Sequence, residues 1–215
     1  MNFVDVSSRL EIPVAPPGYR YLDFLGGERE LRCFLVDESM PRPLFIEKHS
    51  EVLDPALLPI YENAGIYVRQ DASYALPGFY VLSFKTQYPS IDQMDAKSHM
   101  RASFVVREIR KGMREVLGID YIHIYYEEKP DLSCNVHFWL LPVRNPRTGD
   151  TTVIMRLNLR EYLAQFRFSE QKKKILQFNA AMITFIADTK LQLRDCQLSV
   201  LLSSLDGCSN GNYRA

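Results

Sequence analysis

The stretch CNVHFWLLP, residues 134–142, places polar and apolar side chains in alternation. Side chains of a β-strand point to opposite faces in turn, so Asn135, His137 and Trp139 would share one face. The other face is uniformly apolar, which is typical of a core: Val136, Phe138 and Leu140. Of the polar three, only the imidazole can attack an electrophile or move a proton near neutral pH. The pattern therefore predicts a strand with one face in the hydrophobic core. The other face, around His137, would line a binding or catalytic site.

The same stretch resembles the histidine triad (HIT) motif, His-φ-His-φ-His-φ-φ, in which φ is an apolar residue. The middle position keeps its histidine, His137. The first position carries Asn135 and the third carries Trp139, so two of the three histidines are replaced. An amide and an indole N–H can still donate hydrogen bonds, but neither group titrates as a general acid must. The resemblance implies a divergent member of the family whose middle histidine is intact.

The residues before the triad strengthen the resemblance to HIT hydrolases. Their order is a strand start with Asn63, then Asp71, a Pro-Gly turn and an apolar strand that ends in Lys85. Gln87 stands where a further histidine is common, and a long helix and one more strand follow. The resemblance covers roughly residues 45–145. It implies that Asp71 lies at the nucleotide ribose, and that Lys85, Gln87 and Asn63 are further nucleotide-binding residues.

In HIT enzymes the middle histidine attacks a nucleotide α-phosphate, and water or a phosphate then resolves the nucleotidyl-histidine. The resemblance implies a nucleotide phosphohydrolase or nucleotidyl transferase that acts on a nucleoside phosphate or dinucleoside polyphosphate. His137 would be the nucleophile, with Asn135 and Trp139 beside it in the catalytic set. Loss of general acid catalysis costs about 10²–10⁴-fold in rate unless the leaving group is good. The transferase branch of the family carries Gln at the third position, so the resemblance implies that Trp139 weakens hydrolysis more than nucleotidyl transfer.

Other functions stay open. With two triad histidines replaced, the chain can be a catalytically impaired nucleotide-binding protein. Alternatively, the scaffold serves protein interaction through the apolar stripes in the last third of the chain. Single residues have structural alternatives as well: Trp139 can fill the space of the third histidine, and Asp71 can cap a turn. Glu127 and Glu128 form either a carboxylate pair or a solvated strand end.

Composition narrows the class of protein. The 215 residues are 47% apolar and 24% charged, as in ordinary globular proteins. Lys+Arg and Asp+Glu both number 26, and this zero net charge argues against general nucleic-acid binding. The four cysteines show no Cys-x-x-Cys spacing, so we expect no metal site and no other cofactor. Without a secretory leader or an apolar run of about 20 residues, we expect a cytoplasmic protein with no membrane segment.

Periodicity predicts the elements that position these residues. Strands are predicted at 65–70, 79–85, 121–128 and 135–141, and a further strand is open at 151–157. Apolar residues at i, i+3, i+4 and i+7 predict a long amphipathic helix that ends near Gly118, and a second one over 169–190. The segment 191–205 is compatible with either helix or strand. This order predicts an α+β fold: a HIT-like antiparallel sheet with a long amphipathic helix, plus a C-terminal helical extension.

The predicted division of the chain has four parts. Residues 1–40 are rich in Pro and Gly and suggest an extended N-terminal arm. Residues 41–150 form the HIT-like domain, 151–208 the C-terminal helical extension, and 209–215 a frayed tail. HIT proteins often pair through their long helix, so the resemblance also implies a homodimer.

Overall fold

The computed structural model describes residues 3–7, 13–26, 30–40, 42–128, 136–143 and 159–206. Among these residues two antiparallel sheets are found, one of three strands in the order β1-β3-β2 and one of five in the order β4-β5-β6-β8-β7. The small sheet consists of β1 (Val4–Asp5), β2 (Tyr19–Leu25) and β3 (Leu31–Asp37). The large sheet consists of β4 (Pro59–Asn63), β5 (Ile66–Gln70), β6 (Tyr80–Phe84), β7 (Ile122–Glu127) and β8 (His137–Pro142).

Helices pack around the large sheet. They are α1 (Arg42–Lys48), α2 (Ala96–Glu115), α4 (Leu159–Ala164), α5 (Phe168–Asp188) and α6 (Leu191–Asp206). Short 3-10 turns lie at η1 (Ser50–Val52), η2 (Pro55–Leu57) and η3 (Ile91–Gln93). The predicted α+β architecture is confirmed, and the undecided segment 191–205 is helical. The strand left open at 151–157 lies outside the described residues. No helix of the described ranges is both long and apolar enough to cross a bilayer.

The large sheet contains the four strands predicted at 65–70, 79–85, 121–128 and 135–141, which are β5, β6, β7 and β8. Its fifth strand, β4, was not predicted. β4 and β5 form a tight hairpin whose turn residues Ala64 and Gly65 have φ of 41° and 84°. Two successive residues with positive φ are typical of a hairpin turn that matches the twist of its strands. Alanine is an uncommon residue there, which is why the sequence gives a weak signal for this hairpin.

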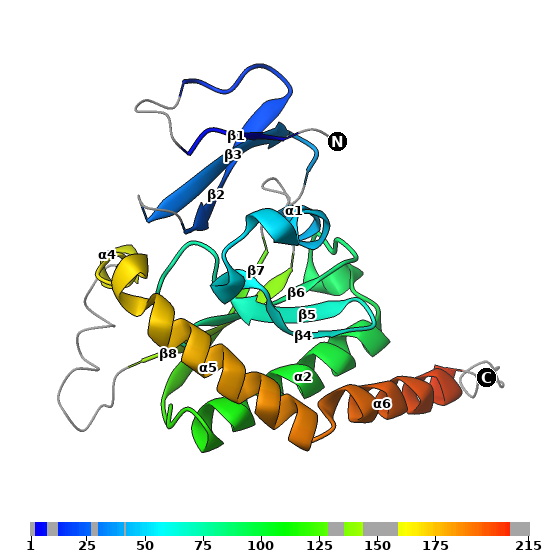
Figure 1. Cartoon of the computed structure of the whole chain (residues 1–215). Coiled ribbons are helices and arrows are strands. Elements are labelled where there is room, and N and C mark those ends of the chain that lie inside the picture. Colours follow the sequence, from blue (N-terminus) through cyan, green and yellow to red (C-terminus); the bar gives the residue numbers. More distant parts are fainter. Residues whose placement is uncertain are drawn as a thin grey trace.

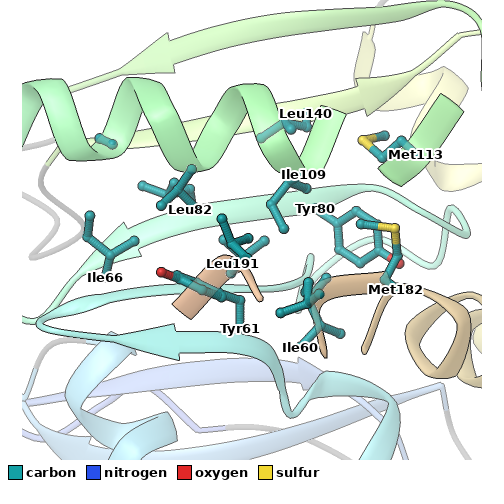
Figure 2. Packing of buried hydrophobic residues seen from close by; sticks show 14 of the residues in the cluster. Ile60, Tyr61, Ile66, Tyr80, Leu82, Ile109, Met113, Leu140, Met182 and Leu191 are labelled. Atoms are coloured by element: carbon teal, nitrogen blue, oxygen red, sulfur yellow. The ribbon is translucent and has the colours of Figure 1, made fainter. Parts of the chain in front are cut away.

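The long helix α2 covers one face of the large sheet. Asp95 caps its first turn by accepting a hydrogen bond from the Ser98 amide at 2.8 Å, and Gly118 follows its end with a φ of 66°. The predicted apolar stripe is buried against the sheet (Figure 2): Ala102, Val105, Ile109 and Met113 pack with Val68, Tyr80, Leu82 and Leu140. This packing fixes which face of the sheet is core and which is available for a site.

Helices α5 and α6 close over α2. Met182, Phe185 and Leu191 belong to the same buried cluster as the α2 stripe. Gly112 permits the close approach, because a Cβ atom there would lie 2.7 Å from the Phe185 ring and 2.8 Å from the Met182 methyl group. Much of the apolar stripe of the last third is therefore core. Exposed apolar side chains remain on the two helices: Leu176, Ile183, Leu193, Val200 and Leu201.

Within the first 40 residues, the described ranges 3–7, 13–26 and 30–40 contain a packed sheet, where an extended arm was predicted. Leu22 and Phe24 of β2 and Phe34 and Val36 of β3 alternate inward and share a buried cluster with Phe45 of α1. The Pro and Gly residues lie in the turns that flank the strands. The prediction of an arm did not take account of the alternation of apolar residues within β2 and β3. The small sheet and α1 lie on the side of the large sheet opposite α2 (Figure 1). The division into domains stays a prediction.

Candidate functional site

The face of the large sheet away from α2 carries a row of polar side chains. Strand register places Tyr67 opposite Ser83, and Glu127 opposite His137. The paired segment of β6 and β8 ends at Leu82 and Phe138, and Ser83 and His137 follow at its edge. Both residues line one cavity, and Glu127 faces His137 from β7.

A cavity of about 340 Å³ lies between this face and β2. Pockets that bind small ligands commonly measure about 300–1,000 Å³. Its polar lining comes from five elements and the loop after β5: Arg20, Arg42, Arg69, Asp71, Ser73, Ser83 and His137. Aromatic side chains line the same cavity: Tyr21, Tyr74 and Trp139. The cavity therefore offers three guanidinium groups against one lining carboxylate, which favours an anionic ligand.

Each arginine is held by contacts of its own. Arg69 on β5 is only 4% exposed, and its Nη1 donates to the Gln70 carbonyl at 3.2 Å. Arg20 on β2 donates from Nη2 to the Met40 carbonyl. Arg42 opens α1. Its Nη1 donates to the Asp23 carbonyl at 2.8 Å and to the Ser73 hydroxyl at 3.0 Å.

Arg42 therefore bridges the small sheet and the loop after β5. Its guanidinium also lies 5.0 Å from the centre of the Phe24 ring. Such a contact positions a guanidinium group and leaves its edge available for hydrogen bonds. Within the described residues, Arg42 makes its hydrogen bonds through Nη1 alone. Its Nε and Nη2 therefore remain as donors for a ligand.

Asp71 lies in the cavity wall and also caps a turn. Its Oδ1 accepts hydrogen bonds from the amides of Ser73 and Tyr74, both at 2.8 Å. Asp71 is 8% exposed, and these two hydrogen bonds hold its carboxylate in place. A carboxylate has two oxygens, and the turn uses one of them. The structural and the ligand-binding role of Asp71 are therefore compatible.

His137 is paired with a carboxylate. Its Nε2 lies 2.9 Å from Oε2 of Glu127, and its side chain is 5% exposed. This contact orients the imidazole ring in the cavity wall. The two glutamates do not form a carboxylate pair, because Glu128 instead accepts hydrogen bonds from the Ile91 amide, at 2.8 Å, and from the Tyr126 hydroxyl.

Trp139 lines the cavity beside His137. Its ring packs edge-on against Phe79, with ring centres 5.2 Å apart, and its centre lies 6.3 Å from that of His137. It forms part of the wall and leaves the cavity open. Asn135 lies outside the described residues. Within the described ranges, no three His, Cys, Asp or Glu side chains are grouped as metal ligands would be.

Two of the predicted nucleotide-binding residues, Lys85 and Gln87, do not line this cavity. The Nζ of Lys85 pairs with Glu47 at 2.8 Å and with Glu62 at 2.9 Å, which ties α1 and β4 to the end of β6. The Gln87 amide lies 3.4 Å from the carbonyl oxygen of Lys85, within its own turn. The sequence places both near the strand end but contains no signal for the glutamates that α1 and β4 bring there.

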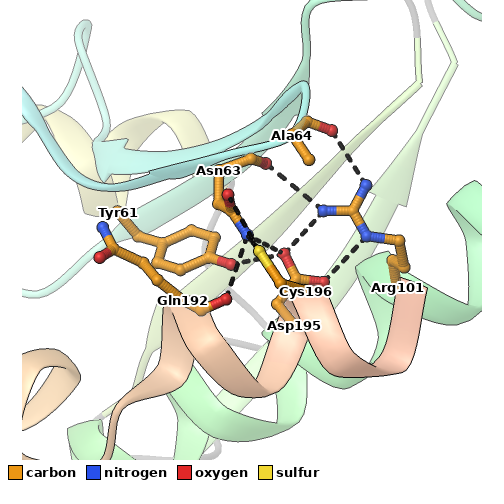
Figure 3. Close-up of polar contacts among 7 residues, drawn as sticks. All are labelled: Tyr61, Asn63, Ala64, Arg101, Gln192, Asp195 and Cys196. Atoms are coloured by element: carbon orange, nitrogen blue, oxygen red, sulfur yellow. Dashed lines mark hydrogen bonds and ion pairs between the residues drawn. The ribbon is translucent and has the colours of Figure 1, made fainter. Parts of the chain in front are cut away.

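Asn63 lies in a separate buried network (Figure 3). Its Nδ2 donates to Asp195 of α6 at 2.9 Å, and the Tyr61 hydroxyl donates to the same carboxylate at 2.6 Å. Arg101 of α2 donates to both oxygens of Asp195, at 2.9 and 2.6 Å. Burial alone would raise the pKa of Asp195, but the hydrogen bonds from Arg101 and Tyr61 outweigh it and lower that pKa. Asn63 thus serves the docking of α6.

The structure brings together His137, Trp139 and Asp71, and adds residues that the sequence analysis did not select. Arg69 and Ser83 had a signal, because strand alternation puts them on the same face as Asp71 and Lys85. Arg20 and Arg42 had none. They lie outside the region of family resemblance and reach the cavity only through the packing of the small sheet and α1.

Comparisons with known proteins give likenesses to solved structures and none to a family model or a curated sequence. A zinc-bound histidine triad family protein from Mycobacterium smegmatis matches with 17% identity and a TM-score of 0.47, covering 67% of this chain and 96% of that chain. A HIT-like protein involved in cell-cycle regulation from Bartonella henselae, with unknown ligand, matches with 14% identity and a TM-score of 0.44, covering 66% and 95%.

The NitFhit protein of C. elegans also matches, with 15% identity and a TM-score of 0.37. The match covers 61% of this chain and 41% of that chain. The first two structures are named as histidine triad or HIT-like proteins.

Proposed function

We propose that this protein binds a nucleoside phosphate in the cavity between β2 and the large sheet. The observation that carries the proposal is the lining of the cavity, where Arg20, Arg42 and Arg69 face one carboxylate, Asp71. Guanidinium groups match phosphate oxygens in geometry and charge, and aromatic walls suit a base. The family resemblance of the motif around His137 supports the same ligand class.

The residues take distinct roles in this proposal. Arg42, through Nε and Nη2, and the buried Arg69 hold the phosphate, because charge-assisted hydrogen bonds in a shielded cavity are strong. The second oxygen of Asp71 accepts hydrogen bonds from the ribose hydroxyls. Tyr21 and Tyr74 flank the base. A general affinity for nucleic acid is not part of the proposal.

Titration calorimetry tests it with AMP, ADP, ATP and a diadenosine polyphosphate, beside adenosine and inorganic phosphate. Hydrogen bonds to charged groups contribute about 1.5–3 kcal/mol, so Arg42→Met and Arg69→Met should each raise Kd by roughly 10- to 150-fold. Lys85→Met is the matched control, since it removes a cation that lies outside the cavity, and it should leave Kd unchanged. Equal losses in all three variants, or no binding by the wild type, would refute the proposal.

A second candidate function is nucleotidyl transfer or phosphohydrolysis with His137 as the nucleophile. The observation that favours it is that His137 lines the same cavity as the arginines. Since Glu127 holds Nε2, attack through this nitrogen requires that Glu127 release the ring. An acid-labile nucleotidyl label that disappears in His137→Ala would support this function. Homodimer formation and a cytoplasmic location also stay predictions; light scattering in solution tests the first.

A further inference from the structure

We propose that two copies of this chain pair through the outer face of helix α5, in an antiparallel and symmetric arrangement. Helix α5 crosses the front of the molecule in Figure 1, and its buried face packs with α2. The pairing therefore differs from the one that the family resemblance implies, which uses the long helix itself. It involves none of the residues that line the arginine cavity, so it goes beyond the proposed function and does not depend on it.

The first observation is an apolar seam along the outer face of α5. Leu176 and Ile183 are 37% and 49% exposed, and the exposed Ala180 lies between them in the chain. Seven residues make nearly two whole turns, so the two large side chains lie on one line along the helix. Spacings of four and then three residues are those by which paired helices meet. Single exposed apolar residues are ordinary, but a seam with this spacing suits a second helix.

The second observation is a hollow beside each of the two large side chains. One hollow, of about 630 Å³, is lined by Leu176 and Ala180. The other, of about 600 Å³, lies between Ile183, Ile60 of β4 and Ile46 of α1. If the two-fold axis passes near Ala180, Ile183 of the second copy meets the first hollow and Leu176 of the second copy meets the second. One surface then supplies both the protruding side chain and the space for it, as a two-fold interface requires.

The charges at the two hollows select the partner. The charged residues that line the first hollow are Lys172 and Lys173, and those that line the second are Glu47 and Glu62. Within the described residues Lys173 makes no ion pair, whereas the two glutamates share a single ammonium group, that of Lys85. Antiparallel pairing sets the basic hollow of each copy against the acidic hollow of the other, and parallel pairing would set like charges together. The occupant that matches both hollows is a second copy of this chain.

Size-exclusion chromatography with light scattering, over a wide range of protein concentrations, tests the pairing. The wild type should have twice the chain mass of 24.9 kDa. Ile183→Glu places a carboxylate in the seam twice, because of the symmetry, and should raise the dimer Kd by at least about 100-fold. Val200→Glu is the matched control, since this residue is 70% exposed on α6 and lines neither hollow; it should leave the dimer intact. Circular dichroism checks that each variant is folded.

An exchange of charges tests the antiparallel arrangement. Lys173→Glu and Glu62→Lys should each raise the Kd of self-pairing by roughly 10-fold, because like charges then meet at two symmetric places. When the two variants are mixed, opposite charges meet again at both places, so native mass spectrometry should find the heterodimer in excess over either homodimer.

Three results would overturn the inference. A wild type that is monomeric at all concentrations would leave the seam to a partner of another kind. A dimer that survives Ile183→Glu unchanged would pair through another surface. Two charge variants that form no excess of heterodimer when mixed would contradict the antiparallel arrangement.

Discussion

Replacement of Asp195 by alanine should strongly destabilise the fold. The Asp195 side chain is fully buried and that of Arg101 is 7% exposed, so the variant would leave a buried guanidinium group without its counter-ion. Breaking a buried ion pair from one side costs about 3–5 kcal/mol. Arg101 would retain the Ala64 carbonyl at 2.9 Å, which favours the lower half of this range.

Urea unfolding followed by circular dichroism measures this loss of free energy, and a thermal scan should show a Tm lower by roughly 6–16 °C. Lys85→Met is the control, because its pairs with Glu47 and Glu62 are solvent-exposed and should contribute at most about 1 kcal/mol. The double variant Arg101→Met with Asp195→Leu removes both charges and should recover part of the loss, because Tyr61 and Asn63 still lack their acceptor. A loss in Asp195→Ala no larger than that of Lys85→Met would refute the reasoning.

Acid should act on the same network. The folded state lowers the pKa of Asp195, so its contribution to stability is fully present above the unfolded value of about 4 and is lost as pH falls through the folded value. Asp195→Asn should therefore lose less stability than the wild type when unfolding is compared between pH 6 and pH 3. An identical pH dependence in both proteins would contradict this assignment.

Three further outcomes follow from the fold. Phe34→Ala should lower the free energy of unfolding by about 3–5 kcal/mol in urea, since the side chain is fully buried; no change would mean that the small sheet is not packed. Gly112→Ala should cost about 1–3 kcal/mol in the same assay, because its Cβ would overlap the α5 side chains. Alkylation at pH 8, read by peptide mass spectrometry, should modify the exposed Cys196 and spare Cys33, where burial raises the thiol pKa to about 12.

Local pattern was enough to predict most of the large sheet and its long helix. The alternation around His137 and the 3.6-residue periodicity of α2 depend only on neighbouring residues, because strand and helix geometry repeat over two and about four positions. The same alternation places Trp139 on the face of His137, and the structure has both at one cavity together with Asp71. The β4–β5 hairpin escaped prediction because its turn contains Ala64 in an uncommon conformation.

The sequence by itself thus determined the polar face of the sheet and the histidine at its centre. Only the tertiary structure decided what that face meets. Packing of the small sheet and α1 brings Arg20 and Arg42 to the cavity. Strand register pairs Glu127 with His137, and Asn63 binds Asp195 of α6 instead of lining the cavity. These contacts join residues between 10 and 132 positions apart in the chain. Such contacts depend on how whole elements pack, and local periodicity carries no information about that packing.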